Sequence, residues 1–128
     1  MTYLAILLII KITVTIVLII IPFLFFKTET LDRKAGFGMP NTAMYRLYGI
    51  ASLALVVAYS GGFLQALSGV YPGEIVAMGT FSNVGAVLVM LTTGYAQTQK
   101  IPTILFAFIA VGFVFSALLP DIAMQPIL

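Results

Sequence analysis

Lys11 is the residue of this 128-residue sequence whose chemistry is hardest to reconcile with its surroundings. It interrupts an apolar run from Tyr3 to Phe26 that is otherwise uncharged. A lysine at the centre of a membrane helix costs about 2.5–3.5 kcal/mol on insertion scales. Thr15, Leu18 and Pro22 follow on the same helical stripe, and Pro22 has no N–H for the carbonyl of Leu18. This stripe therefore offers a cation, a hydroxyl and a free carbonyl to a binding partner.

Two interpretations of Lys11 remain open from the sequence. The polar stripe either faces a partner or an anionic group, or the ammonium snorkels outward from a helix that faces lipid. A rise of about 1.5 Å per residue places Lys11 about 12 Å from Tyr3, and this depth is compatible with snorkelling. Glu74 and Asp121 are the acidic residues that we expect near the same level, where either could pair with Lys11.

Two amides, Gln65 and Asn83, lie inside other apolar runs. An unpaired amide in hydrocarbon is costly, and a hydrogen bond between helices offsets that cost by about 0.5–2 kcal/mol. Ligand contact is the alternative role. We expect helix-to-helix hydrogen bonding for both, with water also reaching Gln65 near the end of its helix.

Phenylalanines form two flanks of the last apolar run, with Phe106 and Phe113 on one and Phe108 and Phe115 on the other. A flat apolar molecule such as a quinone, carotenoid or sterol could lie against such stripes. Packing and lipid contact are the commoner uses of phenylalanine in membrane helices. The sequence therefore identifies no cofactor, and contact with a lipid, quinone or carotenoid stays an alternative.

Several classes of chemistry are disfavoured by composition. The chain has no cysteine and no histidine, which removes thiolate nucleophiles, iron–sulfur ligation and histidine-ligated haem. Proton-coupled carriers rely on a buried Asp, Glu or His, and no acidic residue lies deep in an apolar run of this chain. No metal or nucleotide motif appears, and the basic residues form no run suited to nucleic acid. We therefore expect a protein that is not an enzyme and does not bind nucleic acid.

Composition places the chain in a membrane. Hydrophobic residues make up 62% and charged residues 8%, where a soluble domain has about 45–50% and about 25%. A helix needs about 20 apolar residues to cross a bilayer, and a closed barrel would need many alternating segments. The sequence predicts one all-α integral membrane domain over residues 1–128, with four transmembrane helices at approximately 3–26, 43–67, 75–95 and 101–119.

Short connections at residues 68–73 and 96–100 force their neighbouring helices to run antiparallel, which predicts an up-down bundle. Residues 27–42 form a longer connection of mixed charge, which we expect to be a solvated turn. The loop cations all lie beside the first or third connection: Lys27, Arg33, Lys34, Arg46 and Lys100. Basic residues stay on the cytoplasmic side. We therefore expect both termini on the non-cytoplasmic side, in a bacterial inner membrane.

Small residues predict where the helices touch, because membrane helices associate through close backbone contact. The second predicted helix carries a repeat at four-residue spacing, and the third carries small residues within one narrow arc. The predicted packing residues are Ala54, Ala58, Gly62, Gly79, Ser82 and Ala86.

These features favour an accessory subunit of a larger membrane complex. Catalytic groups are scarce, whereas small-residue faces and a polar stripe suit contact with lipids and other membrane subunits. The alternative is a small homo-oligomeric membrane protein that binds or carries an apolar molecule such as a lipid, quinone or pigment. A cavity lined by Asn83, Gln65, Tyr59 and the phenylalanines would favour that alternative.

Overall fold

The computed structural model describes residues 1–35 and 42–127, and this part of the chain is helical apart from short turns and one isolated bridge. Four helical stretches are long and apolar enough to cross a membrane: Tyr3–Phe25, Thr42–Leu67, Gly73–Thr92 and Lys100–Leu118. Each coincides with one of the predicted stretches to within three residues. The expectation of an all-helical protein with four helices that are long and apolar enough to span a membrane is thereby confirmed for the described residues.

The first stretch is not a uniform α-helix. It comprises α1 (Tyr3–Thr15), the π-helical segment η1 (Ile16–Ile20) and α2 (Ile21–Phe25). The other long helices are α4 (Thr42–Leu67), α5 (Gly73–Thr92) and α7 (Lys100–Leu118). Short helices precede α4, separate α5 from α7 and follow α7: α3 (Thr28–Ala35), α6 (Tyr95–Thr98) and α8 (Pro120–Ala123).

Helix α3 corrects the expectation of a solvated turn after the first spanning stretch. Leu31 is buried there, whereas the charged side chains of Glu29 and Arg33 are exposed. Such an amphipathic segment gains from folding as a helix because one apolar side chain can pack while the others stay in water. Residues 36–41 of the same connection lie outside the described residues.

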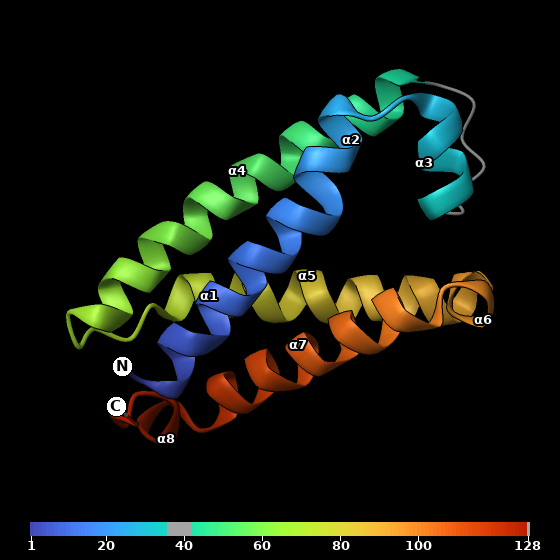
Figure 1. The fold of residues 1–128 in the computed structure, drawn as a ribbon. Helices are drawn as coiled ribbons and strands as arrows, with labels where there is room; N and C mark the ends of the chain where they lie inside the picture. The colour runs from blue at the N-terminus through green and yellow to red at the C-terminus, as the bar shows by residue number, and fades with distance from the viewer. Residues whose placement is uncertain (36–41, 128) are drawn as a thin grey trace.

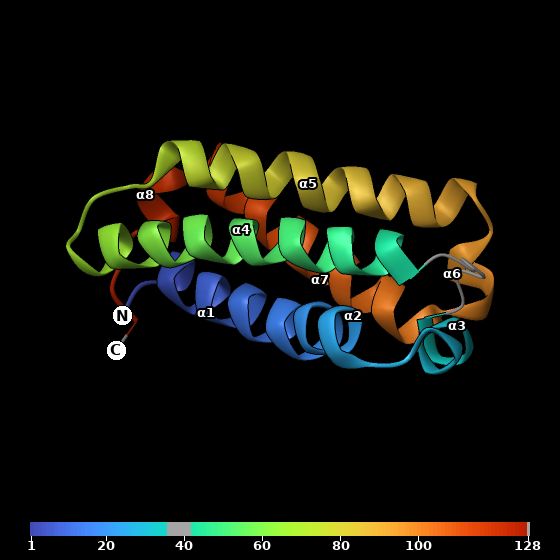
Figure 2. The same ribbon diagram turned by 90° about the horizontal axis from the view of Figure 1, so that it is seen from above.

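The long helices associate as two pairs (Figure 1). One pair is α1–α2 with α4, and the other is α5 with α7. Successive long helices run in opposite directions, and both termini lie at the same end of the molecule (Figures 1 and 2). The two pairs approach each other at that end and separate towards the end that carries α3 and α6 (Figure 1).

Glycines allow the close approach of the helices. A Cβ atom added to Gly62 of α4 would lie 2.6 Å from the Cγ2 of Ile75 at the start of α5. A Cβ atom added to Gly79 of α5 would overlap the ring of Phe113 in α7. Backbone contact of this kind is what stabilises helix pairs where lipid removes the hydrophobic drive.

The predicted packing residues occupy different environments. Gly62 and Gly79 are buried, Ala58, Ser82 and Ala86 are half-buried, and Ala54 is exposed. The buried face of α4 instead follows steps of three and four residues: Tyr45, Gly49, Ser52, Val56, Tyr59, Gly62 and Ala66. A strict four-residue repeat drifts by about 40° per step relative to the helical period. Along the repeat, Gly62 therefore lies on the buried face of α4, whereas Ala54 lies outside it.

The first spanning stretch changes its hydrogen bonding just before Pro22. The N–H of Ile21 donates to the carbonyl of Ile16, which is the π-helical pattern, and Pro22 has no N–H to continue the ladder. Arg46 of α4 then holds α2 by donating to the carbonyls of Phe23 at 2.5 Å and Phe26 at 2.7 Å. These two bonds tie α2 to α4, away from the second helix pair.

Candidate functional site

Lys11 is buried where all four long helices meet. Its side chain is 6% exposed, and its Nζ donates to Oδ1 of Asn83 in α5 at 2.9 Å. Nζ also lies 4.8 Å from the ring centre of Phe106 in α7 and 5.8 Å from that of Tyr59 in α4. An ammonium within about 6 Å of an aromatic face is attracted by the ring quadrupole. One oxygen and two rings therefore stabilise this cation.

Asn83 is held in the orientation that Lys11 requires. Its Nδ2 donates to the carbonyl of Gly79, one turn earlier in α5, at 2.7 Å. Because the amide nitrogen is used in this way, the amide oxygen faces the ammonium, which has donors only. The hydroxyls of Tyr59 and Ser82 are 3.2 Å apart and extend the polar cluster to α4.

Neither acid that the sequence offered as a partner pairs with Lys11. Glu74 and Asp121 are both exposed, and the ammonium is bonded to Asn83. Since the side chain of Lys11 is buried, it does not snorkel along the surface of α1 in this structure. The lysine therefore joins the first helix pair to the second, at the point beyond which the pairs separate.

Thr15 and Gln65, the other predicted polar residues, lie in contrasting places. Thr15 is 2% exposed, and within the described residues its hydroxyl has no hydrogen-bond partner. Gln65 is exposed near the end of α4, so it does not join the polar cluster around Lys11. A buried hydroxyl without a partner is destabilising, typically by about 1–3 kcal/mol.

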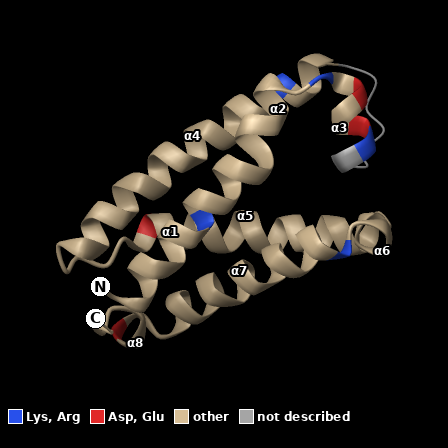
Figure 3. Ribbon diagram, in the orientation of Figure 1, with Lys and Arg blue, Asp and Glu red and all other residues tan. Residues whose placement is uncertain are grey.

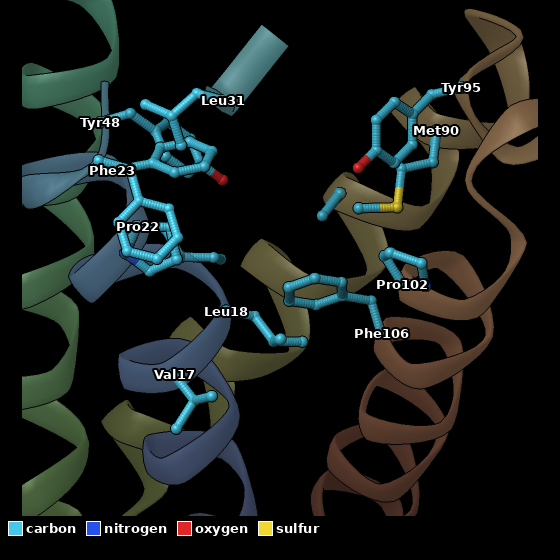
Figure 4. Close-up of a pocket in the computed structure, with 13 residues that line it drawn as sticks. Val17, Leu18, Pro22, Phe23, Leu31, Tyr48, Met90, Tyr95, Pro102 and Phe106 are labelled. Atoms are coloured by element: carbon cyan, nitrogen blue, oxygen red, sulfur yellow. The ribbon is translucent and has the colours of Figure 1, made fainter. Parts of the chain in front are cut away.

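An apolar cavity of about 340 Å³, here called the cleft, lies between the two helix pairs. Figure 4 shows Phe23 and Tyr48 facing Met90 and Tyr95 across it, with Phe106 at the narrow end. The π-helical segment also contributes to its wall, with residues 17–19. The irregular part of the first helix therefore borders the cleft, as π-helical turns frequently do at functional sites.

A wider hollow of about 690 Å³ adjoins the cleft at the α6 end. The two share Phe23, Tyr48, Ala86, Met90 and Tyr95 in their walls. The hollow adds hydroxyl groups that the narrow end of the cleft lacks, from Ser82, Thr93 and Thr98. Serine and threonine hydroxyls therefore line the hollow and not the cleft.

Tyr95 stands at the junction of the cleft and the hollow, in α6 and outside the long helices. Burial raises the pKa of its phenol, and the charge interaction with Tyr48 adds to this rise. The phenol is therefore protonated at neutral pH and keeps its O–H group.

Phe106 connects the cleft with the polar cluster, because its ring contacts Lys11 and also lines the cleft. The remaining predicted phenylalanines divide by flank. Phe113 is buried against Tyr59 at a centroid distance of 5.8 Å, whereas Phe108 and Phe115 are exposed. Of the four, only Phe106 lines the cleft.

Charge is distributed unequally between the two ends of the molecule (Figure 3). The end where the pairs separate has five basic and two acidic residues, a formal charge of +3: Lys27, Glu29, Asp32, Arg33, Lys34, Arg46 and Lys100. Glu74 and Asp121 lie at the opposite end, where the termini meet. The opening between the helix pairs is therefore on the basic side.

Sequence patterns did not single out the aromatic lining of the cleft. Tyrosines near helix ends, such as Tyr48 and Tyr95, are typical of a membrane interface, and Phe23 is one of many apolar residues of the first span. A signal was present in Pro22, which directly follows a run rich in β-branched residues and weakens the regular helix there.

Within the described residues, no three acidic side chains lie close enough together to hold a metal ion. No family model matches the chain, and neither a curated protein nor a solved structure matches it.

Proposed function

We propose that this protein holds an apolar small molecule, of the lipid, quinone or pigment class, inside a membrane. The observation that supports this is the cleft between the helix pairs, about 340 Å³ and lined by aromatic and aliphatic side chains. Ligand sites are typically concave, mostly apolar and about 300–1,000 Å³ in volume, with a few polar groups that orient the ligand. The phenols of Tyr48 and Tyr95 supply such groups here.

Specific contacts keep the cleft open. Arg46 holds α2 against α4 through two backbone carbonyls, and the π-helical turn beside Pro22 lines the gap. The bond from Lys11 to Asn83 fixes the narrow end. Strong polar contacts at both positions argue for a built cavity rather than loose packing.

The test is to purify the protein from its membrane in mild detergent and to quantify the apolar molecules that remain bound. Ala86→Phe places a ring into the cleft and the hollow, both of which Ala86 lines. Ala77→Phe puts the same bulk on an exposed position of α5 and serves as the control. We expect Ala86→Phe to lose the bound molecule and Ala77→Phe to retain it. Equal retention by both variants would contradict the proposal.

The orientation proposed with this function places the α3 and α6 end in the cytoplasm of a bacterial cell and both termini outside. Its support is the excess of basic residues at that end. The chain has no cysteine, so single-cysteine variants are specific probes. In intact cells an impermeant thiol reagent should label Val70→Cys and spare Thr30→Cys and Gln97→Cys. The reverse labelling pattern would invert the orientation.

The accessory-subunit role is the second candidate function. Its support is a shallow groove of about 310 Å³ on α5 and α7, lined by apolar side chains alone: Val84, Ala110, Val111, Val114 and Phe115. A helix of another subunit could pack there. We expect Val111→Trp to fill the groove and reduce the particle mass of the gently solubilised protein to that of the 13.8 kDa chain. A wild-type protein that already has the mass of one chain would contradict this role.

A further inference from the structure

We propose that the occupant of the cleft is an anionic phospholipid, with an acyl chain between the helix pairs and its headgroup at the basic opening. This inference rests on the proposed function, because it names the chemical class of the molecule that the cleft holds. Two independent gradients along the cleft support it, one in polarity and one in charge.

The polarity gradient matches a molecule with an apolar tail. Val17, Leu18 and Phe106 line the narrow end and offer no side-chain hydrogen-bonding group. Hydroxyl groups occur in the hollow near the ends of α5 and α6, on Thr93 and Thr98. Lys11, whose ammonium lies 4.8 Å from the ring centre of Phe106, is bonded to Asn83 and does not line the cleft. The lining of the narrow end therefore suits an apolar tail.

The charge gradient matches a negative headgroup at the opening. Three exposed cations lie within two residues of side chains that line the cleft. The three cations are Lys27, Arg33 and Lys100. The lining residues near them in the sequence are Phe26, Leu31 and Pro102, respectively. The cations therefore come from three separate segments of the chain. Arg46 is not counted among them because its guanidinium is bonded to the carbonyls at the end of α2.

The acidic residues at this end do not cancel that charge. The carboxylate of Asp32 accepts a hydrogen bond from the phenol of Tyr45, and Glu29 is the other acid at this end. The three exposed cations against these two acids leave a formal charge of +1, and the whole end, with Lys34 and Arg46 included, has +3. The opposite end carries Glu74 and Asp121 and would repel an anionic headgroup.

The cleft is deep enough for the first part of one acyl chain in this orientation. Six residues of α7 separate Lys100 from Phe106, which at about 1.5 Å per residue is about 9 Å. If the headgroup lies beside Lys100, the first part of the acyl chain is therefore long enough to reach Phe106. The open side of the cleft leaves room for the rest of the lipid.

The experiment uses the full-length protein in vesicles of phosphatidylcholine with 20% phosphatidylglycerol, followed by mild extraction and native mass spectrometry of the lipids that stay bound. One variant combines Lys27→Gln, Arg33→Gln and Lys100→Gln. The control changes two charges at the opposite end, Glu74→Gln with Asp121→Asn. Ala86→Phe tests whether the bound lipid occupies the cleft.

We expect the wild-type protein and the control to retain phosphatidylglycerol above its share in the vesicle. The enrichment should fall by at most about fivefold for each cation removed. The effect of each cation should be smaller at high salt, because salt screens exposed charges. Ala86→Phe should abolish retention of the lipid. Enrichment that survives in Ala86→Phe would place the headgroups on the outer surface and overturn the inference.

The remaining outcomes separate the inference from the function on which it rests. Retention of both lipids in proportion to the vesicle, lost in Ala86→Phe, would overturn the anionic specificity and leave an apolar ligand in the cleft. Retention of no lipid by the wild-type protein would overturn the inference. If its native membrane also yields no bound apolar molecule, the proposed function fails as well.

Discussion

Removing the acceptor of Lys11 should destabilise the protein more than removing Lys11 itself. Asn83→Leu leaves a buried ammonium with aromatic contacts and without the oxygen that lies 2.9 Å away. Breaking a buried charged pair from one side costs about 3–5 kcal/mol because the remaining charge stays desolvated. The rings of Phe106 and Tyr59 persist and offset part of that loss. We therefore expect Asn83→Leu to lower the free energy of unfolding by about 3 kcal/mol.

Lys11→Met keeps an unbranched side chain of similar length and removes the charge. It leaves the amide oxygen of Asn83 without its donor, which costs about 1–2 kcal/mol. The double variant removes both polar groups, and buried pairs replaced by apolar residues are often close to neutral. The loss in the double variant should therefore be smaller than the sum of the single losses by about 2–4 kcal/mol.

The assay is reversible unfolding in mixed micelles by titration with a denaturing detergent, which yields the free energy of unfolding of each variant. Thr80→Val is a matched control on α5, since within residues 1–35 and 42–127 the hydroxyl of Thr80 bonds only to the carbonyl of Val76 in its own helix. The control should change stability by less than about 1 kcal/mol. Additive losses, or a larger loss in Lys11→Met than in Asn83→Leu, would refute the reasoning.

Three further predictions concern stability in the same assay. Thr15→Val should raise the free energy of unfolding by about 1 kcal/mol, because it removes a buried hydroxyl that has no partner within the described residues; a loss would mean that the hydroxyl is bonded. Arg46→Met should lower it by about 2–4 kcal/mol through the loss of two charge-assisted bonds to α2, and an unchanged value would contradict that role. Gly79→Val should lower it by about 1–3 kcal/mol through overlap with Phe113. Gly85→Val has no such neighbour and should stay close to the wild type, so equal losses at both glycines would point to helix propensity instead.

Hydropathy alone predicted the four spanning helices, because the length of an uncharged run is a local property that lipid thickness selects. The polar residues Lys11 and Asn83 were also recognisable from their type and position. Their pairing was not, because the two residues are 72 positions apart and meet only where the two helix pairs come together. Local patterns indicate that such groups need partners and leave the partner unspecified.

The cleft could not be predicted because it depends on an angle between helix pairs. Pro22 indicated that the first helix loses a hydrogen bond. The π-helical hydrogen bonding of η1, however, is an outcome of packing as well as of sequence. Ala54 lies off the buried face of α4 for a related reason. Large side chains such as Tyr45 and Tyr59 fill the interface of α4, so residue size alone did not identify the contact face.

The position of the contact between Lys11 and Asn83 makes the width of the opening sensitive to small rotations. Nine residues separate Asn83 from Thr92 at the end of α5, a lever arm of about 14 Å at 1.5 Å per residue. If the narrow end acts as the pivot, a tilt of about 10° moves the far end of α5 by about 2.4 Å. At the other end, the N–H of Ile127 donates to the carbonyl of Met1 at 2.8 Å, which couples the two chain ends and restrains the pivot. Movements too small to disturb the polar cluster would thus change whether an acyl chain fits between the helix pairs.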